Sequence, residues 1–166
     1  MREKMINCYL ALGSNLGQRK NNICSAISML EESSDVILIS KSEIYESRAM
    51  YNKNMKDFYN SVICIKTRLS AFKLLQYTQL IEKKLGRVKG KERYSNRVID
   101  IDILSYGDEM IDSEELTVPH PHIKERKFVL KPWSDIDSNY VLARTNKNIE
   151  ELLKESSDNS RLQKIK

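Results

Sequence analysis

The sequence GRVKGKERYSNRVIDIDILSYG spans residues 86–107, and its second half decides how the chain folds. From Val98 to Leu104, apolar and acidic residues alternate, and this alternation predicts a β-strand. On a strand, Asp100 and Asp102 project from one face, while the isoleucines around them pack into a core on the other face. Two carboxylates on one strand face repel each other unless a cation lies between them. The pattern therefore points to a divalent ion bound by oxygen atoms.

A basic segment interrupted by Gly86 and Gly90 precedes this strand. Its cationic residues are Arg87, Lys89, Lys91, Arg93 and Arg97. A cationic loop that enters an acidic strand suits a polyphosphate carried with magnesium, because the metal bridges phosphate oxygens while Arg and Lys neutralise the remaining charge. We expect residues 88–96 to be mobile until a ligand gives them contacts. An isolated Asp-x-Asp pattern is also typical of a solvated edge strand, and that alternative stays open here.

The segments around this strand predict the α+β class. Apolar periodicity predicts strands over 5–12, 35–47, 58–67 and 98–104, and helices over 19–32 and 70–85. Ser70 is suited to cap the second helix and Gly86 to end it. The resulting order, βαββαβ, is that of ferredoxin-like folds, with an antiparallel sheet and both helices on one face.

Additional C-terminal elements follow this core. We expect a short hairpin near 108–111, irregular structure over the proline-containing 116–133 and a short helix over 149–154. The length fits one domain over 1–166. The polar tail from about residue 155 is expected to be disordered.

Composition limits the location and partners of the protein. No apolar run approaches the roughly 18 residues of a membrane helix, and residues 5–12 resemble a first strand more than a signal peptide, so we expect a cytoplasmic protein. Cys8, Cys24 and Cys64 are odd in number and widely spaced, which favours reduced thiols over a disulfide or zinc framework. The net charge of +5 favours an anionic partner without choosing between a nucleotide, a nucleic acid and an acidic surface.

Three sequence blocks, taken in order, carry a family resemblance. They are YLALGSNLG at 9–17, GRV at 86–88 followed by RVIDIDIL at 97–104, and LTVPH at 116–120. Together they resemble the 6-hydroxymethyl-7,8-dihydropterin pyrophosphokinases of folate synthesis over residues 5–136. The resemblance implies a ferredoxin-like core and a reaction in which the terminal pyrophosphate of ATP moves to the pterin hydroxymethyl group, releasing AMP.

The resemblance also implies roles for individual residues. Asp100 and Asp102 would hold two magnesium ions with ATP, and Arg87 and Arg97 would act catalytically on the phosphates. The implied nucleotide contacts are Gln79, Glu82, Lys89, Ile103, Thr117, His120 and Arg126, and the implied pterin contacts are Ser47, Arg48, Met50, Phe58, Asn60, Tyr94 and Phe128. These residue types suit a flat heteroaromatic ring, which binds between aromatic faces and beside an amide. The expected partners are therefore ATP and the pterin, bound by a monomer.

Two other classes of protein share the predicted element order. An RNA-recognition-like module would explain the basic charge, but the strand over 60–65 lacks the aromatic pair that stacks bases. A regulatory ligand-binding domain would explain the fold, but it would leave Arg87, Arg97 and the two aspartates without a role. We therefore expect no nucleic acid and no membrane among the partners.

Overall fold

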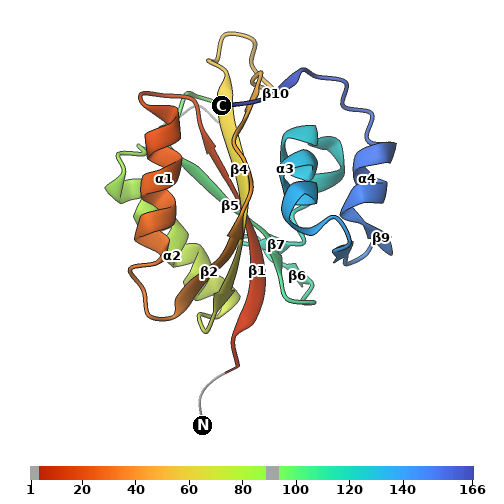
Figure 1. Ribbon diagram of the computed structural model, residues 1–166. Helices are drawn as coiled ribbons and strands as arrows, with labels where there is room; N and C mark the ends of the chain where they lie inside the picture. Colours follow the sequence, from red (N-terminus) through yellow and green to blue (C-terminus); the bar gives the residue numbers. More distant parts are fainter. Residues whose placement is uncertain (1–3, 89–93) are drawn as a thin grey trace.

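The computed structural model describes residues 4–88 and 94–166, and Figure 1 shows how their elements are arranged. In these residues an antiparallel sheet runs in the order β10-β3-β4-β1-β5, and β2 pairs with β4 beside β3. Its strands are β1 (Ile6–Ser14), β2 (Val36–Lys41), β3 (Tyr45–Ser47), β4 (Phe58–Thr67), β5 (Asp100–Tyr106) and β10 (Leu162–Lys164). The predicted antiparallel sheet of the α+β class is confirmed.

Helices cover both faces of this sheet, as Figure 1 shows. On one face lie α1 (Arg19–Leu30) and α2 (Ala71–Lys84), and on the other lie α3 (Lys127–Asp137) and α4 (Ile149–Glu155). The α1/α2 side buries alternate strand residues such as Leu10 and Ile101, while the α3/α4 side buries Tyr9 and Leu104. The prediction that the first two helices share one face is confirmed.

Smaller elements lie outside the main sheet. They are the hairpin of β6 (Ile111–Asp112) with β7 (Thr117–Val118), the 3-10 helix η1 (Ile123–Glu125), and the pair of β8 (Val141–Leu142) with β9 (Lys147–Asn148). The sequence predicts this hairpin near 108–111, but its first strand begins only at Ile111, the last residue of that range. Among the described residues, no helix has both the length and the apolar character needed to cross a membrane.

The prediction of irregular structure over 116–133 is wrong in its last part. Helix α3 begins at Lys127 and continues through Pro132, although a proline inside a helix cannot donate the backbone hydrogen bond to the carbonyl four residues earlier. Val129, Leu130 and Trp133 are at most 3% exposed in the core against the sheet. Burial of this apolar face compensates for the missing bond.

The expected disorder of the tail is also not what the structure has. Residues Leu162–Lys164 form β10, which pairs with β3, and Ile165 N donates to Ile44 O at 2.8 Å. Asp158 accepts a hydrogen bond from the backbone N of Lys127 at the start of α3. Backbone hydrogen bonds therefore order this polar segment. Such pairing produces no apolar pattern from which the strand could be predicted.

The cap of α2 provides a test of the local structure that carries Glu82. Ser70 Oγ accepts a hydrogen bond from Lys73 N at 3.4 Å. We expect Ser70→Ala to lower the free energy of unfolding by about 1 kcal/mol, because it leaves an N-terminal amide of the helix without this acceptor. Ser70→Asp keeps an acceptor and is the control. Equal urea unfolding midpoints for both variants would contradict the capping role.

Candidate active site

The register of three neighbouring strands builds the floor of a cavity. Gly13 of β1 pairs with Asn60 on one side and with Asp100 on the other, and Ala11 pairs in the same way with Val62 and Asp102. Paired residues of a sheet project from the same face, so small residues lie between the two rows of larger side chains. A Cβ on Gly13 would lie 3.6 Å from the Phe58 ring and 3.7 Å from Asn60 Oδ1. The small residues of β1 therefore keep the centre of the floor open.

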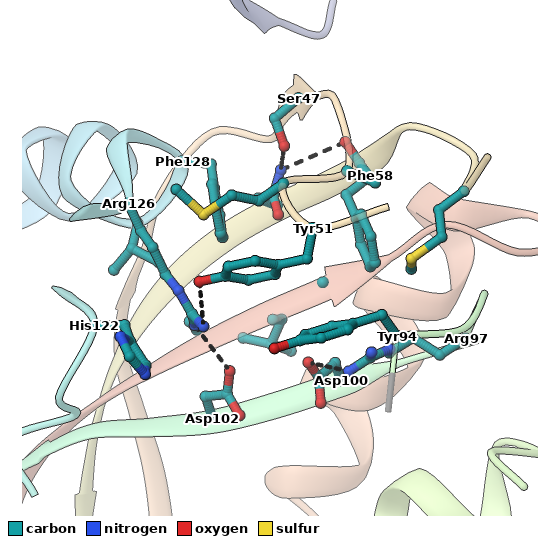
Figure 2. A pocket seen from close by; sticks show the side chains of 18 of the residues that line it. Ser47, Tyr51, Phe58, Tyr94, Arg97, Asp100, Asp102, His122, Arg126 and Phe128 are labelled. Atoms are coloured by element: carbon teal, nitrogen blue, oxygen red, sulfur yellow. Dashed lines mark hydrogen bonds and ion pairs between the residues drawn. The ribbon is translucent and has the colours of Figure 1, made fainter. Parts of the chain in front are cut away.

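The cavity above this floor has a volume of about 600 Å³. It lies between the sheet, the start of α3 and the segment 48–57, and Figure 2 shows most of the side chains that line it. The predicted residues that line it are Ser47, Arg48, Met50, Phe58, Asn60, Arg87, Tyr94, Arg97, Asp100, Asp102, His120, Arg126 and Phe128. The structure thus brings together most of the predicted site residues.

Four other predicted nucleotide contacts do not line this cavity. Gln79 is exposed on α2, Ile103 is 3% exposed in the core, and Thr117 lies in β7. Glu82 is buried behind the strand that carries the two aspartates. Lys89 lies outside the described residues, as do Lys91 and Arg93.

At one end of the cavity, two arginines neutralise Asp100. Arg87 Nη1 lies 2.7 Å from Asp100 Oδ1, and Arg97 Nη1 lies 3.0 Å from Asp100 Oδ2. Arg87 Nη1 also lies 2.5 Å from Glu82 Oε1, which in turn accepts the backbone N–H of Ile101 at 2.7 Å. Glu82 therefore fixes β5 and Arg87 together from behind the cavity.

Asp102 has much weaker compensation. It forms an ion pair with Arg126, whose Nη1 lies 3.9 Å from Asp102 Oδ2. Burial, and then the negative charge of Asp100, raise the pKa of Asp102 well above its ordinary value. Among the described residues there is no cluster of three or more His, Cys, Asp or Glu side chains that could hold a metal alone. Asp102, whose charge is only weakly compensated, and the neighbouring Asp100 nevertheless fit a hard cation whose remaining ligands are phosphate and water.

Arg126, the partner of Asp102, also has an incomplete set of hydrogen bonds. Its Nε is buried and has no hydrogen-bond partner within the described structure. Its guanidinium carbon lies 5.8 Å from the centre of the Phe128 ring, and Nη2 reaches the Tyr51 hydroxyl at 3.5 Å, the limit of a hydrogen bond. A guanidinium with unsatisfied donors beside a cavity is suited to bind an anion.

His120 is held in one protonation state near this arginine. Its Nδ1 accepts the backbone N–H of His122 at 3.2 Å, so in the neutral ring the proton lies on Nε2. Burial, and then the charge of Arg126, lower the pKa of His120 to about 4. His120 is therefore a neutral hydrogen-bond donor at physiological pH.

The other end of the cavity is aromatic and amide-lined. Phe58 and Phe128 supply ring faces. The Asn60 side-chain amide donates to Ser47 Oγ at 2.8 Å and to Tyr45 O at 3.2 Å, which fixes its orientation. Asn60 Oδ1 then faces the cavity floor beside Gly13. This end suits a flat ring with polar edges.

Some residues that line the cavity carry no signal in the sequence. Tyr51 and Met55 come from a segment without periodicity, so no pattern marked them. The small residues Ala11 and Gly13 did leave a signal, because they alternate with buried residues on a strand that must lie beside the acidic one. A cavity floor can be predicted from that alternation.

The open face that an RNA-recognition module would need is covered. Such modules stack bases on the face of the sheet opposite their two helices. Here α3 and α4 pack on that face through Trp133 and Leu152, with Val62 and Leu104 beneath them. A charged end next to an aromatic end, enclosed between sheet and helix, instead suits a substrate that combines a charged chain with a flat ring.

Comparisons with known proteins agree with this class of site. The model of the 7,8-dihydro-6-hydroxymethylpterin-pyrophosphokinase family, HPPK, matches residues 9–138, and the chain belongs to this family. It is 38% identical over 154 residues to the 2-amino-4-hydroxy-6-hydroxymethyldihydropteridine pyrophosphokinase of Haemophilus influenzae, covering 93% of this chain and 95% of that protein. It is 45% identical over 133 residues to the folic acid synthesis protein fol1 of Pneumocystis carinii, covering 80% of this chain but only 18% of that protein.

A solved structure supports the fold. The wild-type HPPK-DHPS of Plasmodium falciparum aligns with a TM-score of 0.72 and 17% identity, covering 92% of this chain and 45% of that one. At this identity the likeness shows the fold alone. The predicted family and ferredoxin-like fold are thus confirmed.

Glu82 gives a prediction about how the site is supported. We expect Glu82→Ala to lower the free energy of unfolding by about 1–3 kcal/mol, because the buried N–H of Ile101 loses its acceptor. Glu82→Gln keeps that acceptor. Burial raises the pKa of Glu82, so the loss of its charge should cost little.

Urea unfolding of both Glu82 variants tests this. Gln79→Ala, at an exposed position one turn earlier on α2, is the control and should change stability by less than about 0.5 kcal/mol. Equal losses for Glu82→Gln and Glu82→Ala would instead mean that the ion pair with Arg87 carries the effect.

His120 gives a prediction about pH. Because its pKa is lowered from 6.5 to about 4, the unfolded chain binds a proton between these values that the folded chain does not. Neutral His120 therefore contributes to the free energy of unfolding above about pH 6.5, and this contribution is lost as the pH falls toward 4. We expect the free energy of unfolding to fall less over this range in His120→Gln than in the unmodified chain. If the free energy of unfolding changed with pH in the same way in both proteins, neutral His120 would be contradicted.

Proposed function

We propose that this chain transfers pyrophosphate from ATP to the hydroxymethyl group of 6-hydroxymethyl-7,8-dihydropterin and releases AMP. Membership of the HPPK family and the names of its relatives support this reaction. The observation that carries it is that one cavity holds the Asp100–Asp102 pair and the cationic side chains at one end, and Phe58 and Phe128 at the other.

The phosphate chain of ATP would lie at the charged end. We propose that Asp100 and Asp102 would hold two magnesium ions there, whose positive charge would lower the barrier to attack on phosphorus. Arg87 and Arg97 engage both oxygens of Asp100 in the free chain. A small shift of each guanidinium toward the phosphates would release Asp100 and place planar donors on the transferred group.

The rest of the nucleotide would contact residues around this end. His120 can donate from Nε2, and the Nη atoms of Arg126, which lie beside Tyr51 and Asp102, can bind a phosphate oxygen. Gln79 and Thr117 lie outside the cavity, so their contacts require a nucleotide that extends beyond it. Ile103 can offer only its backbone, because its side chain is in the core. Lys89 stays a proposed contact, and we assign Glu82 to the support of Arg87.

The pterin would occupy the aromatic end. We propose that it stacks between Phe58 and Phe128, with Asn60 fixed by Ser47 to read its polar edge. Arg48, Met50 and Tyr94 would complete this end from the cavity wall. The hydroxymethyl oxygen would then point along the floor over Gly13 toward the phosphates. An in-line attack would then need the protein to act mainly by positioning the two substrates.

We further propose that the chain acts as a cytoplasmic monomer. Its three cysteines are free, and Cys8 and Cys64 are buried, which suits a reducing compartment. Analytical ultracentrifugation at micromolar concentration tests the monomer, and a concentration-dependent increase in mass would contradict it.

The reaction itself has a direct test. Purified protein is mixed with magnesium, ATP and 6-hydroxymethyl-7,8-dihydropterin, and the nucleotide products are separated. We expect AMP to form only when the pterin is present. ADP as the main product would identify an ordinary kinase and contradict the proposal.

Substitution of Asp102 tests the proposed magnesium site. We expect Asp102→Asn to lower turnover on the order of a hundredfold, because a carboxylate ligand serves the charged transition state. The same variant should fold at least as well, with an unfolding free energy up to about 1 kcal/mol higher, because partial burial and the neighbouring charge of Asp100 disfavour the ionised form of Asp102 and raise its pKa. The gain is small because the Asp102 side chain is 36% exposed. Near-normal turnover would remove Asp102 from the metal site.

Arg87 and Arg97 test the phosphate contacts. Replacement of either by Lys keeps the charge but removes the planar pair of donors, so we expect turnover to fall on the order of tenfold to a hundredfold. Arg144→Lys, at an exposed ion pair far from the cavity residues in the sequence, is the matched control. Full activity of both site variants would mean that only their positive charge matters.

A further inference from the structure

Tyr51 lies inside the cavity in a place that the sequence did not predict. Its ring stacks on that of Tyr94, with 4.9 Å between ring centres and 29° between ring planes. The guanidinium carbon of Arg126 lies 5.9 Å from the centre of the Tyr51 ring. Both tyrosines line the cavity, and Tyr51 is 48% and Tyr94 39% exposed. The pair is therefore formed within open space and not within the packed core.

The position of this pair relates it to both ends of the site. In Figure 2 the two rings lie between Phe58 and Phe128 on one side and Asp100 and Asp102 on the other. The contacts of Arg126 agree with that view, because its guanidinium reaches Tyr51, Asp102 and Phe128 together. A substrate whose ring lies between the phenylalanines and whose reacting group meets the phosphates must cross the same space.

We propose that Tyr51 sets the affinity of this site for its ring substrate by occupying, in the free chain, the space between the aromatic and charged ends. The two tyrosine rings must separate before a flat heteroaromatic compound bound between Phe58 and Phe128 can extend its reacting group to the charged end. The identity of that compound as a pterin rests on the proposed function. Tyr51 thus acts as an internal competitor of the substrate.

The segment that carries Tyr51 is held by contacts that do not involve its ring. Asn52 Nδ2 lies 3.5 Å from Tyr94 O, and Lys56 N donates to Asn96 Oδ1 at 3.1 Å. Asn15 Nδ2 donates to the same Asn96 oxygen at 2.9 Å. Truncation of the Tyr51 ring therefore leaves the segment attached, so its effect on binding can be measured separately from any effect on folding.

The strength of one aromatic pair sets the size of the effect. Stacked rings in a protein and a weak contact with a guanidinium each change an equilibrium by a small factor. Removal of a conformation that excludes the ligand increases apparent affinity by the inverse of the fraction of chains that can bind. We therefore expect the Kd of the pterin to fall by about three- to tenfold when the Tyr51 ring is removed.

Calorimetric titration measures this. The probe is 6-hydroxymethylpterin, added in the presence of magnesium and a non-hydrolysable ATP analogue to the unmodified chain, Tyr51→Ala, Tyr51→Phe and Lys53→Ala. Tyr51→Ala should bind about three- to tenfold more tightly, and Tyr51→Phe, which keeps the ring, should stay within about twofold. Lys53→Ala is the matched control, because Lys53 is exposed in the same segment and does not line the cavity.

Steady-state kinetics distinguish this role of Tyr51 from a purely structural one, because only the proposed role lowers KM without changing kcat. Tyr51→Ala should lower KM for the pterin and leave kcat within about twofold, because the competing state is removed before chemistry. An unchanged or larger Kd in Tyr51→Ala would overturn the inference while AMP formation upheld the proposed reaction. Absence of pterin binding and of AMP formation in the unmodified chain would overturn the proposed function itself.

Discussion

The pairing of β5 with β1 is the constraint on which the rest of the site depends. In this register Asp100 and Asp102 face the cavity opposite Gly13 and Ala11, and Ile101 and Ile103 face the core under α1 and α2. A slip of one residue would exchange these faces, placing two carboxylates in an apolar core and two isoleucines in the cavity. The free energy of burying unpaired charge makes that alternative inaccessible. The same pairing that gives the sheet its core therefore orients the two carboxylates.

Charge balance follows from this placement. The described residues near the two aspartates include three carboxylates and three guanidiniums, namely Glu82, Asp100, Asp102, Arg87, Arg97 and Arg126. With the three carboxylates ionised and His120 neutral, this set carries no net charge. A polyphosphate that entered such a set alone would leave it strongly negative, and the charge of Asp102 is already only weakly compensated. Binding of the phosphate chain together with divalent cations restores the balance, which is a physical reason for a nucleotide that arrives with magnesium.

Much of the fold could be predicted because its signals are local. Alternation located β4 at residues 58–67, and the Ser70 cap and helical spacing located α2. The failures have a common cause in non-local contacts. Helix α3 persists through Pro132 because the sheet buries Trp133, and β10 is ordered because β3 supplies backbone partners. Neither effect is present in the segment itself. Tyr51 escaped prediction for the same reason, since only the fold brings it to Tyr94.

These non-local elements also change what the ferredoxin-like core can bind. Without α3, the face that carries Phe58, Asn60 and Asp100 would be an open sheet, the surface on which related topologies bind extended single-stranded chains. With α3 packed over Val62 and Leu104, only the end of that face stays accessible, and Arg126 and Phe128 at the start of the helix form its wall. An open surface becomes a cavity of about 600 Å³ with charge at one end and rings at the other. A cavity of that size encloses a small molecule and can exclude water from a transferred phosphoryl group, which an open sheet cannot do.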